Sequence, residues 1–264
     1  MIYNCKRQKG MMKRKLLTIS ILLYTFFSIA QTKVIAHRGY WNTKGSAQNS
    51  ITALLKADSL GIYGSEFDVR VSKDSVLIIN HDSDLWGYNI AKSDAKTLTT
   101  IQLKNKETMP TLTDYFEAAR PLSIQLILEL KNLASPEIET YAVAQIIKQI
   151  EEYGYKNRVE FISFSLHAVK EMIKQAPHIP TYYLGGELSP KELKELGCTG
   201  LDYHFSVFKK NPQWISESHQ LGLKVNCWTV NKEAEMKKLI HQGVDFITTD
   251  EPQLLRDLLK NTLK

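Results

Sequence analysis

The sequence predicts an α/β chain folded as a single (β/α)8 barrel, the TIM barrel. Eight short apolar runs alternate with segments whose apolar residues recur at helical spacing, a pattern typical of parallel strands joined by helices. No linker, low-complexity segment or break in composition divides the chain. Its 264 residues also suit one such barrel, which takes about 250.

The first thirty residues are set aside as a predicted signal peptide, residues 1–30, which leaves 31–264 as the barrel domain. Six Lys or Arg residues precede an apolar run that starts at Leu16 and closes with Ser28-Ile29-Ala30. The alternative is a membrane anchor, but about fifteen apolar residues fall short of the roughly 20 that a spanning helix needs. We therefore expect export to a periplasm or to the outside, with no stable membrane insertion after cleavage.

The charge balance gives no support for nucleic-acid or membrane-surface binding by the mature chain. The whole sequence has a formal net charge of +6, and residues 1–30 hold six Lys or Arg and no Asp or Glu, so the remainder is 6 − 6 = 0. The basic character therefore belongs to the leader. We expect a small-molecule substrate and no nucleic-acid partner.

The elements follow one another in a regular order. The expected strands are residues 34–36, 65–71, 124–130, 159–164, 181–184, 200–203, 224–230 and 245–249. Helix starts are marked by Ser50, Ser135, Ser189 and Asn231. Helix ends are marked by Gly61, Gly154, Gly197, Gly222 and Gly243.

Two features interrupt this regularity. Between His81 and Thr111 the alternation stops, and we predict a short insertion after the second strand region: a lid-like loop with a short helix. Two cysteines, Cys198 and Cys227, lie outside the leader, and Cys227 falls within an apolar run. We predict two unpaired thiols in the core rather than a disulfide.

Three carboxylates are the candidate metal ligands. Glu66 and Asp68 are two residues apart in a strand and share one face, and Glu129 ends the next expected barrel strand. Burying them together requires positive charge, and oxygen donors suit Mg²⁺ or Ca²⁺. The alternative is that each carboxylate pairs with a Lys or Arg at the barrel rim.

His37 and His81 each follow an apolar run, where an imidazole reaches the mouth of a barrel. Histidine titrates in the range needed to remove one proton and supply another. The alternative for each is a core histidine with satisfied nitrogens. Arg38 and Lys131 are the candidate phosphate ligands, since a guanidinium offers a planar fork and an ammonium a point charge.

Taken in order, His37-Arg38-Gly39, Asn49, Glu66-x-Asp68, His81-Asp82 and Glu129-Leu130-Lys131 resemble the glycerophosphodiester phosphodiesterase family. The likeness runs from about residue 33 to the last helix. It implies that His37 and His81 form the acid/base pair and that Arg38 assists catalysis by withdrawing charge from the phosphoryl oxygens. It also implies that Glu66, Asp68 and Glu129 hold one divalent cation. Asn49 would orient the metal shell or the phosphate. The family has Pro-Glu where this chain has Ala47-Gln48, which removes a negative charge near the site.

Other residues are assigned from their local setting. Trp228 either packs against glycerol carbons of a substrate or belongs to ordinary barrel packing. Asp250 is predicted to cap the last helix. His204 is expected to be structural, and His167, His178, His219 and His241 are expected to be surface residues without partners.

The resemblance therefore implies a metal-dependent phosphoric diester hydrolase that converts glycerophosphodiesters to glycerol 3-phosphate and an alcohol. One alternative is a phospholipase-like enzyme that acts on intact or other lipid phosphodiesters. The other is a barrel that binds phosphodiesters without cleaving them. Retention of both histidines and all three carboxylates favours the enzyme.

Overall fold

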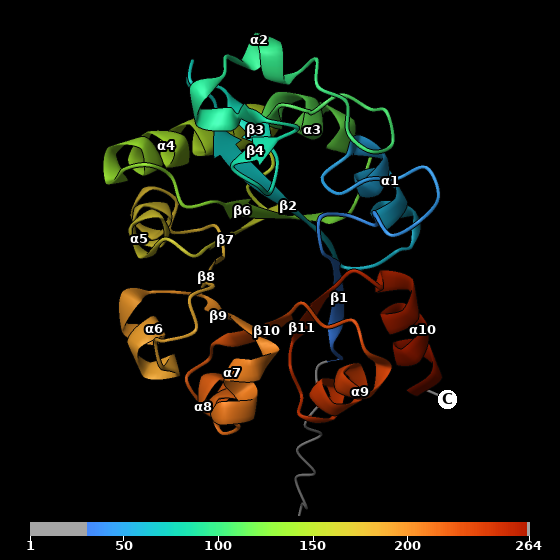
Figure 1. Cartoon of the computed structure of the whole chain (residues 1–264). Helices are drawn as coiled ribbons and strands as arrows, with labels where there is room; N and C mark the ends of the chain where they lie inside the picture. Colours follow the sequence, from blue (N-terminus) through green and yellow to red (C-terminus); the bar gives the residue numbers. More distant parts are fainter. Residues whose placement is uncertain (1–30, 263–264) are drawn as a thin grey trace, which may run out of the picture.

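The structure, a computed structural model, describes residues 31–262 and consists of a closed barrel (Figure 1). The parallel strands follow the order β1-β11-β10-β9-β8-β7-β6-β2, and pairing of β1 with β2 closes the ring. These strands are β1 (Lys33–Ala36), β2 (Gly64–Val71), β6 (Gln125–Leu130), β7 (Val159–Ser163), β8 (Thr181–Tyr183), β9 (Gly200–His204), β10 (Lys224–Trp228) and β11 (Phe246–Thr249). The predicted (β/α)8 architecture is confirmed. The signal peptide predicted for residues 1–30 lies outside the described residues.

Helices surround the ring of strands. They are α1 (Ile51–Ser59), α3 (Leu112–Ala119), α4 (Pro136–Tyr153), α5 (Leu166–Gln175), α6 (Pro190–Leu196), α7 (Phe205–Lys210), α8 (Trp214–Gln220), α9 (Glu233–His241) and α10 (Pro252–Thr262). Ser50, Ser135 and Ser189 cap their helices as predicted, each accepting a hydrogen bond from a first-turn amide. The prediction that Asn231 caps a helix is wrong, because the N-cap of α9 is Lys232. Across residues 31–262, no helix has the length and apolar character needed to cross a bilayer.

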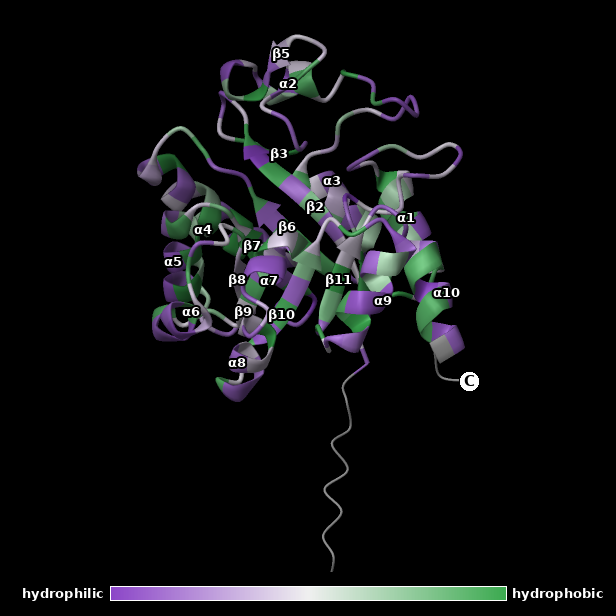
Figure 2. Ribbon diagram, turned by 60° about the horizontal axis from the view of Figure 1, so that its bottom comes forward, coloured by the Kyte–Doolittle hydropathy of each residue, from purple (hydrophilic) through white to green (hydrophobic). Residues whose placement is uncertain are grey.

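Apolar side chains fill two regions of the barrel. The larger lies between the strands and the helices, and Figure 2 shows hydrophobic and hydrophilic residues together along α9 and α10, as expected for helices with one buried face. The smaller lies inside the barrel, where Ile35, Ile127, Tyr182 and Phe246 pack together. The interior is therefore a filled core, and the polar site described below occupies its mouth.

The predicted insertion lies between β2 and α3 and has its own structure. β3 (Leu77–Ile79) pairs antiparallel with β2, and a hairpin follows from β4 (Asp84–Leu85) and β5 (Tyr88–Asn89). The short helical pieces are η1 (Ile90–Lys92) and α2 (Ala95–Leu98), so the predicted short helix is present. A separate apolar cluster that includes Ile78 holds the insertion together beside the barrel.

The two cysteines within residues 31–262, Cys198 and Cys227, are buried and unpaired, which confirms the prediction. Burial raises the pKa of the Cys198 thiol to about 11 and that of Cys227 well above its usual value. The thiols therefore stay protonated at neutral pH and serve as small apolar side chains.

Candidate active site

Most of the candidate residues meet in one pocket at the ends of the barrel strands. The exceptions are Asp68, which is buried and absent from the pocket lining, and Asn49, which lines the adjoining larger cavity. This pocket has a volume of about 160 Å³ and is lined by His37, Arg38, Glu66, His81, Glu129, Lys131, Ile162, Phe164, Leu184, Asp202, Trp228, Thr229 and Thr248. His37 follows β1, and Lys131 follows β6. In a parallel barrel all these strand ends face the same side, so residues far apart in sequence converge there.

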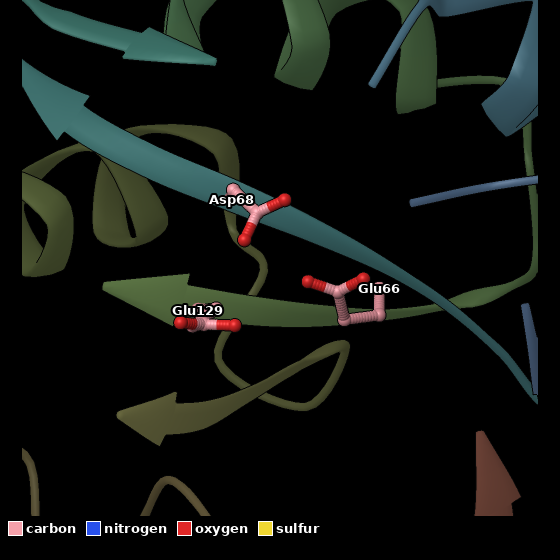
Figure 3. Close-up of side chains that lie close together, drawn as sticks. All are labelled: Glu66, Asp68 and Glu129. Carbon is pink, nitrogen blue, oxygen red and sulfur yellow. The ribbon is translucent and has the colours of Figure 1, made fainter. Parts of the chain in front are cut away.

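The three predicted metal ligands form a compact buried cluster. Glu66 and Asp68 project from β2, and Glu129 projects from the neighbouring strand β6 (Figure 3). The register pairs Asp68 with Glu129, so the alternation of side chains brings all three to one face. One ligand atom from each residue lies within 4.8 Å of the others. The sequence prediction of a shared face is thus confirmed.

Crowding disturbs the ionisation of these carboxylates. Burial, followed by the charges of Asp68 and Glu129, raises the pKa of Glu66 well above its usual range. Burial, followed by the charge of Asp68, raises the pKa of Glu129 to about 7. Burial also acts to raise the pKa of Asp68, but Lys131, His81 and Arg38 together lower it. The cluster is short of positive charge, which is the condition that favours a bound cation.

The fit to a hard divalent cation rests on one further observation. Glu66 Oε1 is buried and has no hydrogen-bond partner, although Glu66 Oε2 accepts a 2.7 Å hydrogen bond from the Arg38 backbone amide. A buried carboxylate oxygen left without a donor is costly unless a ligand completes its shell. Three carboxylates with such an oxygen form a donor set that suits Mg²⁺ or Ca²⁺.

Two cationic side chains lie beside the cluster. Lys131 Nζ lies 2.6 Å from Glu129 Oε1 and 3.3 Å from Asp68 Oδ1. Arg38 Nε lies 3.7 Å from Asp68 Oδ2, and Arg38 Nη1 donates a 2.8 Å hydrogen bond to Gln48 Oε1. Gln48 therefore contacts the guanidinium without neutralising it. Because Gln48 is neutral, this contact leaves the positive charge of Arg38 available to an anionic ligand.

The loop after β1 is fixed by close packing and by an amide. Gly39 has a φ of +76°, and a Cβ there would lie 2.6 Å from the Cβ of Ala53, so only glycine fits. Asn49 Nδ2 donates to Asp68 Oδ2 at 2.8 Å, and Asn49 Oδ1 accepts from the Asp68 amide at 3.1 Å. Asn49 thus holds Asp68 in position.

His37 has a carboxylate partner that sequence reasoning missed. His37 Nδ1 lies 2.8 Å from Asp250 Oδ1, across 213 residues of sequence. Trp41 Nε1 donates to the same oxygen, and Asn231 Nδ2 donates to Asp250 Oδ2. The prediction that Asp250 caps the last helix is wrong, because its carboxylate is taken up by these three side chains. This contact fixes the ring of His37 and leaves Nε2 as the nitrogen available to a substrate.

His81 is held differently. Its Nδ1 lies 2.7 Å from Oδ1 of the adjacent Asp82, which is mostly exposed. Arg70 fixes the loop by donating two hydrogen bonds to the His81 carbonyl oxygen, at 2.9 and 2.7 Å. Burial lowers the pKa of His81 despite the nearby charge of Asp68.

The family model described as "Glycerophosphoryl diester phosphodiesterase family" matches residues 37–254. The chain belongs to this family. A glycerophosphodiester phosphodiesterase of Caldanaerobacter subterraneus is 30% identical over 246 residues, covering 87% of this chain and 98% of the relative. Membership makes this chain a phosphoric diester hydrolase by class.

Solved structures agree with this assignment. One from Parabacteroides distasonis, described as a glycerophosphodiester phosphodiesterase, is 44% identical with a TM-score of 0.88, covering 89% of this chain and 99% of the other. An Oleispira antarctica phosphodiesterase in complex with the product sn-glycerol-3-phosphate is 28% identical with a TM-score of 0.76, covering 87% and 97%. The resemblance stated from the motifs is therefore confirmed.

In this member of the family, an aromatic wall borders the pocket. Trp228 contacts Phe164 with ring centroids 5.5 Å apart, and Trp228 Nε1 donates to the Asp202 carbonyl oxygen at 2.8 Å. Trp228 therefore combines barrel packing with a place in the pocket lining. His204 is structural, as predicted, since its Nδ1 accepts a hydrogen bond from the Ser206 amide at the start of α7.

Two histidines outside the pocket have partners, contrary to the prediction. His219 Nε2 lies 2.9 Å from Asp245 Oδ2, and His167 Nε2 lies 2.9 Å from Thr140 Oγ1. Both contacts join residues distant in sequence, so no local signal revealed them. The contact of His219 joins α8 to the residue that precedes β11, and the contact of His167 joins α5 to α4. Both lie away from the site.

Asp202 lines the pocket although the sequence did not indicate it. It is fully buried on β9, and its Oδ1 has no hydrogen-bond partner. Burial raises the pKa of Asp202 to about 8. The group is therefore a neutral carboxylic acid at pH 7, able to donate a hydrogen bond into the pocket.

Proposed function

We propose that this chain hydrolyses glycerophosphodiesters to glycerol 3-phosphate and an alcohol. One observation carries the proposal: His37, His81, Arg38 and Lys131 line the same pocket as two members of the carboxylate cluster. Hydrolysis of a phosphodiester requires a proton acceptor, a proton donor and positive charge around the phosphoryl oxygens. All three requirements are met by residues of this pocket.

Glu66, Asp68 and Glu129 would hold one divalent cation, Mg²⁺ or Ca²⁺. When bound, the cation stabilises negative charge on the phosphoryl oxygens. Asn49 fixes Asp68 within this donor set through two hydrogen bonds. The partnerless Glu66 oxygen and the raised pKa values of Glu66 and Glu129 support this assignment.

Arg38 and Lys131 would bind the phosphate. The Arg38 guanidinium is anchored at one nitrogen by the neutral Gln48, which preserves its charge for the substrate. Lys131 is nearly buried and keeps its proton: burial acts to lower its pKa, but Asp68 and Glu129 outweigh that effect and raise it. Trp228 and Phe164 would pack against the glycerol carbons.

The two histidines would divide the proton transfers. His37, oriented by Asp250, would use Nε2 to remove a proton from the attacking group, which is water or the neighbouring glycerol hydroxyl. His81 would protonate the leaving alkoxide, because it lies at the boundary between the inner pocket and a larger outer cavity where a leaving group has room. The glycerol hydroxyl route passes through a cyclic phosphate that water then opens.

The test is release of glycerol 3-phosphate from glycerophosphoethanolamine by residues 31–264, with Mg²⁺, with Ca²⁺ and with chelator. Wild-type protein should turn over only with a cation, and His37→Gln should abolish turnover. His219→Gln is the matched control, because His219 also pairs with a buried aspartate but lies outside the pocket. Folded wild-type protein that releases no glycerol 3-phosphate from any glycerophosphodiester would refute the proposal.

We also propose that the chain is exported through residues 1–30, whose basic start and short apolar run support a cleavable signal. N-terminal sequencing of the protein secreted by an expressing bacterium tests this. A mature protein that still begins at the first residues would contradict it.

A further inference from the structure

A second, larger cavity adjoins the active-site pocket. It has a volume of about 720 Å³, more than four times the 160 Å³ of the inner pocket, and His81 lines both. The loop that carries Trp41 to Asn49 forms one wall, and the insertion after β2 forms the other. A substrate whose phosphate lies in the inner pocket would therefore extend past His81 into this outer cavity.

Trp86 projects from the insertion at the edge of the outer cavity in an unusual conformation. It occupies the first position of the two-residue turn between the paired residues Leu85 and Tyr88. Trp86 has a φ of 54° and Gly87 a φ of 86°, the geometry of a hairpin turn that strongly prefers Asn-Gly. Tryptophan is disfavoured there, since the left-handed region crowds a bulky L side chain.

Folding does not explain this tryptophan. Its side chain is 60% exposed, so it contributes little to a core. Its indole is nevertheless held in place, because Nε1 donates a 2.9 Å hydrogen bond to the Gln102 carbonyl oxygen. A strained, exposed and oriented aromatic side chain beside a cavity indicates a ligand contact.

The rest of the lining indicates which ligand. Trp41 supplies a second indole, and Lys44, Lys104 and Asp84 supply donors and acceptors of both charges. Aromatic faces stack on the C–H faces of a ring, and mixed polar groups exchange hydrogen bonds with its hydroxyls. Two lysines disfavour a quaternary ammonium group, which aromatic cages otherwise suit. The polar groups likewise disfavour an acyl chain.

We propose that the outer cavity binds the leaving alcohol of the substrate, that this alcohol is a polyhydroxylated ring such as a cyclitol or a sugar, and that Trp86 determines this preference by stacking on the ring. The proposal rests on the proposed function, because the ring is the group that leaves when the phosphodiester is cleaved. It assigns the insertion a role in substrate selection.

Trp86→Asn is the decisive variant, since it introduces Asn-Gly, the pair that this turn prefers, and so favours the native hairpin. Tyr88→Asn is the matched control: Tyr88 lies on the same hairpin and is 47% exposed, but it does not line the cavity. We would measure kcat/KM of wild type and both variants on glycerophosphoinositol, glycerophosphoglucose, glycerophosphoethanolamine and glycerophosphocholine. The first two substrates distinguish a cyclitol from a sugar.

Wild type should prefer at least one ring substrate, and Trp86→Asn should lower kcat/KM for that substrate roughly tenfold, the effect of losing one stacking contact. Its kcat/KM for glycerophosphoethanolamine should change less than twofold, as should all values for Tyr88→Asn. An unchanged ring preference in Trp86→Asn overturns the inference, as does a loss confined to glycerophosphocholine, which would indicate an ammonium site. Wild type that cleaves ethanolamine but neither ring overturns this inference alone. Wild type that cleaves no glycerophosphodiester overturns the proposed function as well.

Discussion

Replacing Asp250 with asparagine tests whether the contact with His37 supports catalysis. The variant keeps the shape of the side chain but removes the charge that faces His37 Nδ1 at 2.8 Å. An asparagine that turns its amide nitrogen toward His37 also favours the tautomer with a proton on Nε2, which cannot act as a base. A hydrogen bond to a charged group contributes about 1.5–3 kcal/mol, which corresponds to a loss in kcat of roughly 10- to 150-fold.

The assay is glycerol 3-phosphate release at saturating substrate, with kcat and KM determined separately. Asp250 does not line the pocket, so KM should change little while kcat falls. Asp245→Asn is the matched control, because Asp245 faces His219 at 2.9 Å away from the site, and its kcat should equal that of wild type. A kcat for Asp250→Asn within twofold of wild type would refute the reasoning, as would an equal loss in both variants.

Three further predictions concern stability. Burial raises the pKa of Asp202 to about 8, so folded protein keeps a proton there that the unfolded chain releases near pH 4; Asp202→Asn should unfold at a higher temperature than wild type above pH 8 and at the same temperature below pH 4. Burial acts to raise the pKa of Asp245, but hydrogen bonds from Lys224, Val225 and His219 outweigh burial and lower it. The contribution of Asp245 to the stability of the fold is therefore present above about pH 4 and is lost as the pH falls below that. Asp245→Asn should lower the free energy of unfolding, measured in urea, by about 1–3 kcal/mol at pH 7 and by little at pH 2. Glu66→Gln removes one of three crowded carboxylates, so in the presence of chelator the variant should melt at a higher temperature than wild type. Ca²⁺ or Mg²⁺ should raise the melting temperature of wild type but not that of the variant. A wild-type melting temperature that neither cation changes would contradict the metal site.

Much of the fold follows from local sequence pattern. The run 65–71 corresponds to β2 (Gly64–Val71), and its alternation correctly set Glu66 and Asp68 on one face. Differences arise at ends: the run 224–230 predicted a longer strand than β10 (Lys224–Trp228), because hydrophobicity continues after strand pairing stops. Hydrophobic periodicity reports burial, whereas the end of a strand depends on its neighbours.

The site residues that sequence reasoning missed all depend on contacts distant in sequence. Asp250 before Pro252 has the local appearance of a helix cap, and only the position of His37 gives it another partner. Asn231 likewise has the appearance of a cap, but its side chain binds the Asp250 amide and carboxylate. Asp202 stands in an apolar strand with no motif around it. For Asp250 and Asn231 the decisive neighbour follows the end of another strand.

Closure of the barrel explains why these contacts form. The first and last strands pair with Ala36 opposite Thr249, so the next residue on each, His37 and Asp250, are neighbours at the rim. The loop after β1 is fastened to the same place, since Trp41 donates to Asp250 and Asn42 donates to Glu251. Bringing together two residues that are 213 positions apart costs loop-closure entropy. The pairing of β1 with β11 already incurs this cost. The orientation of His37 therefore adds no separate closure cost, but it exists only in the complete barrel. A change that breaks the β1–β11 pairing should therefore open the barrel and abolish activity together, because it also separates His37 from Asp250.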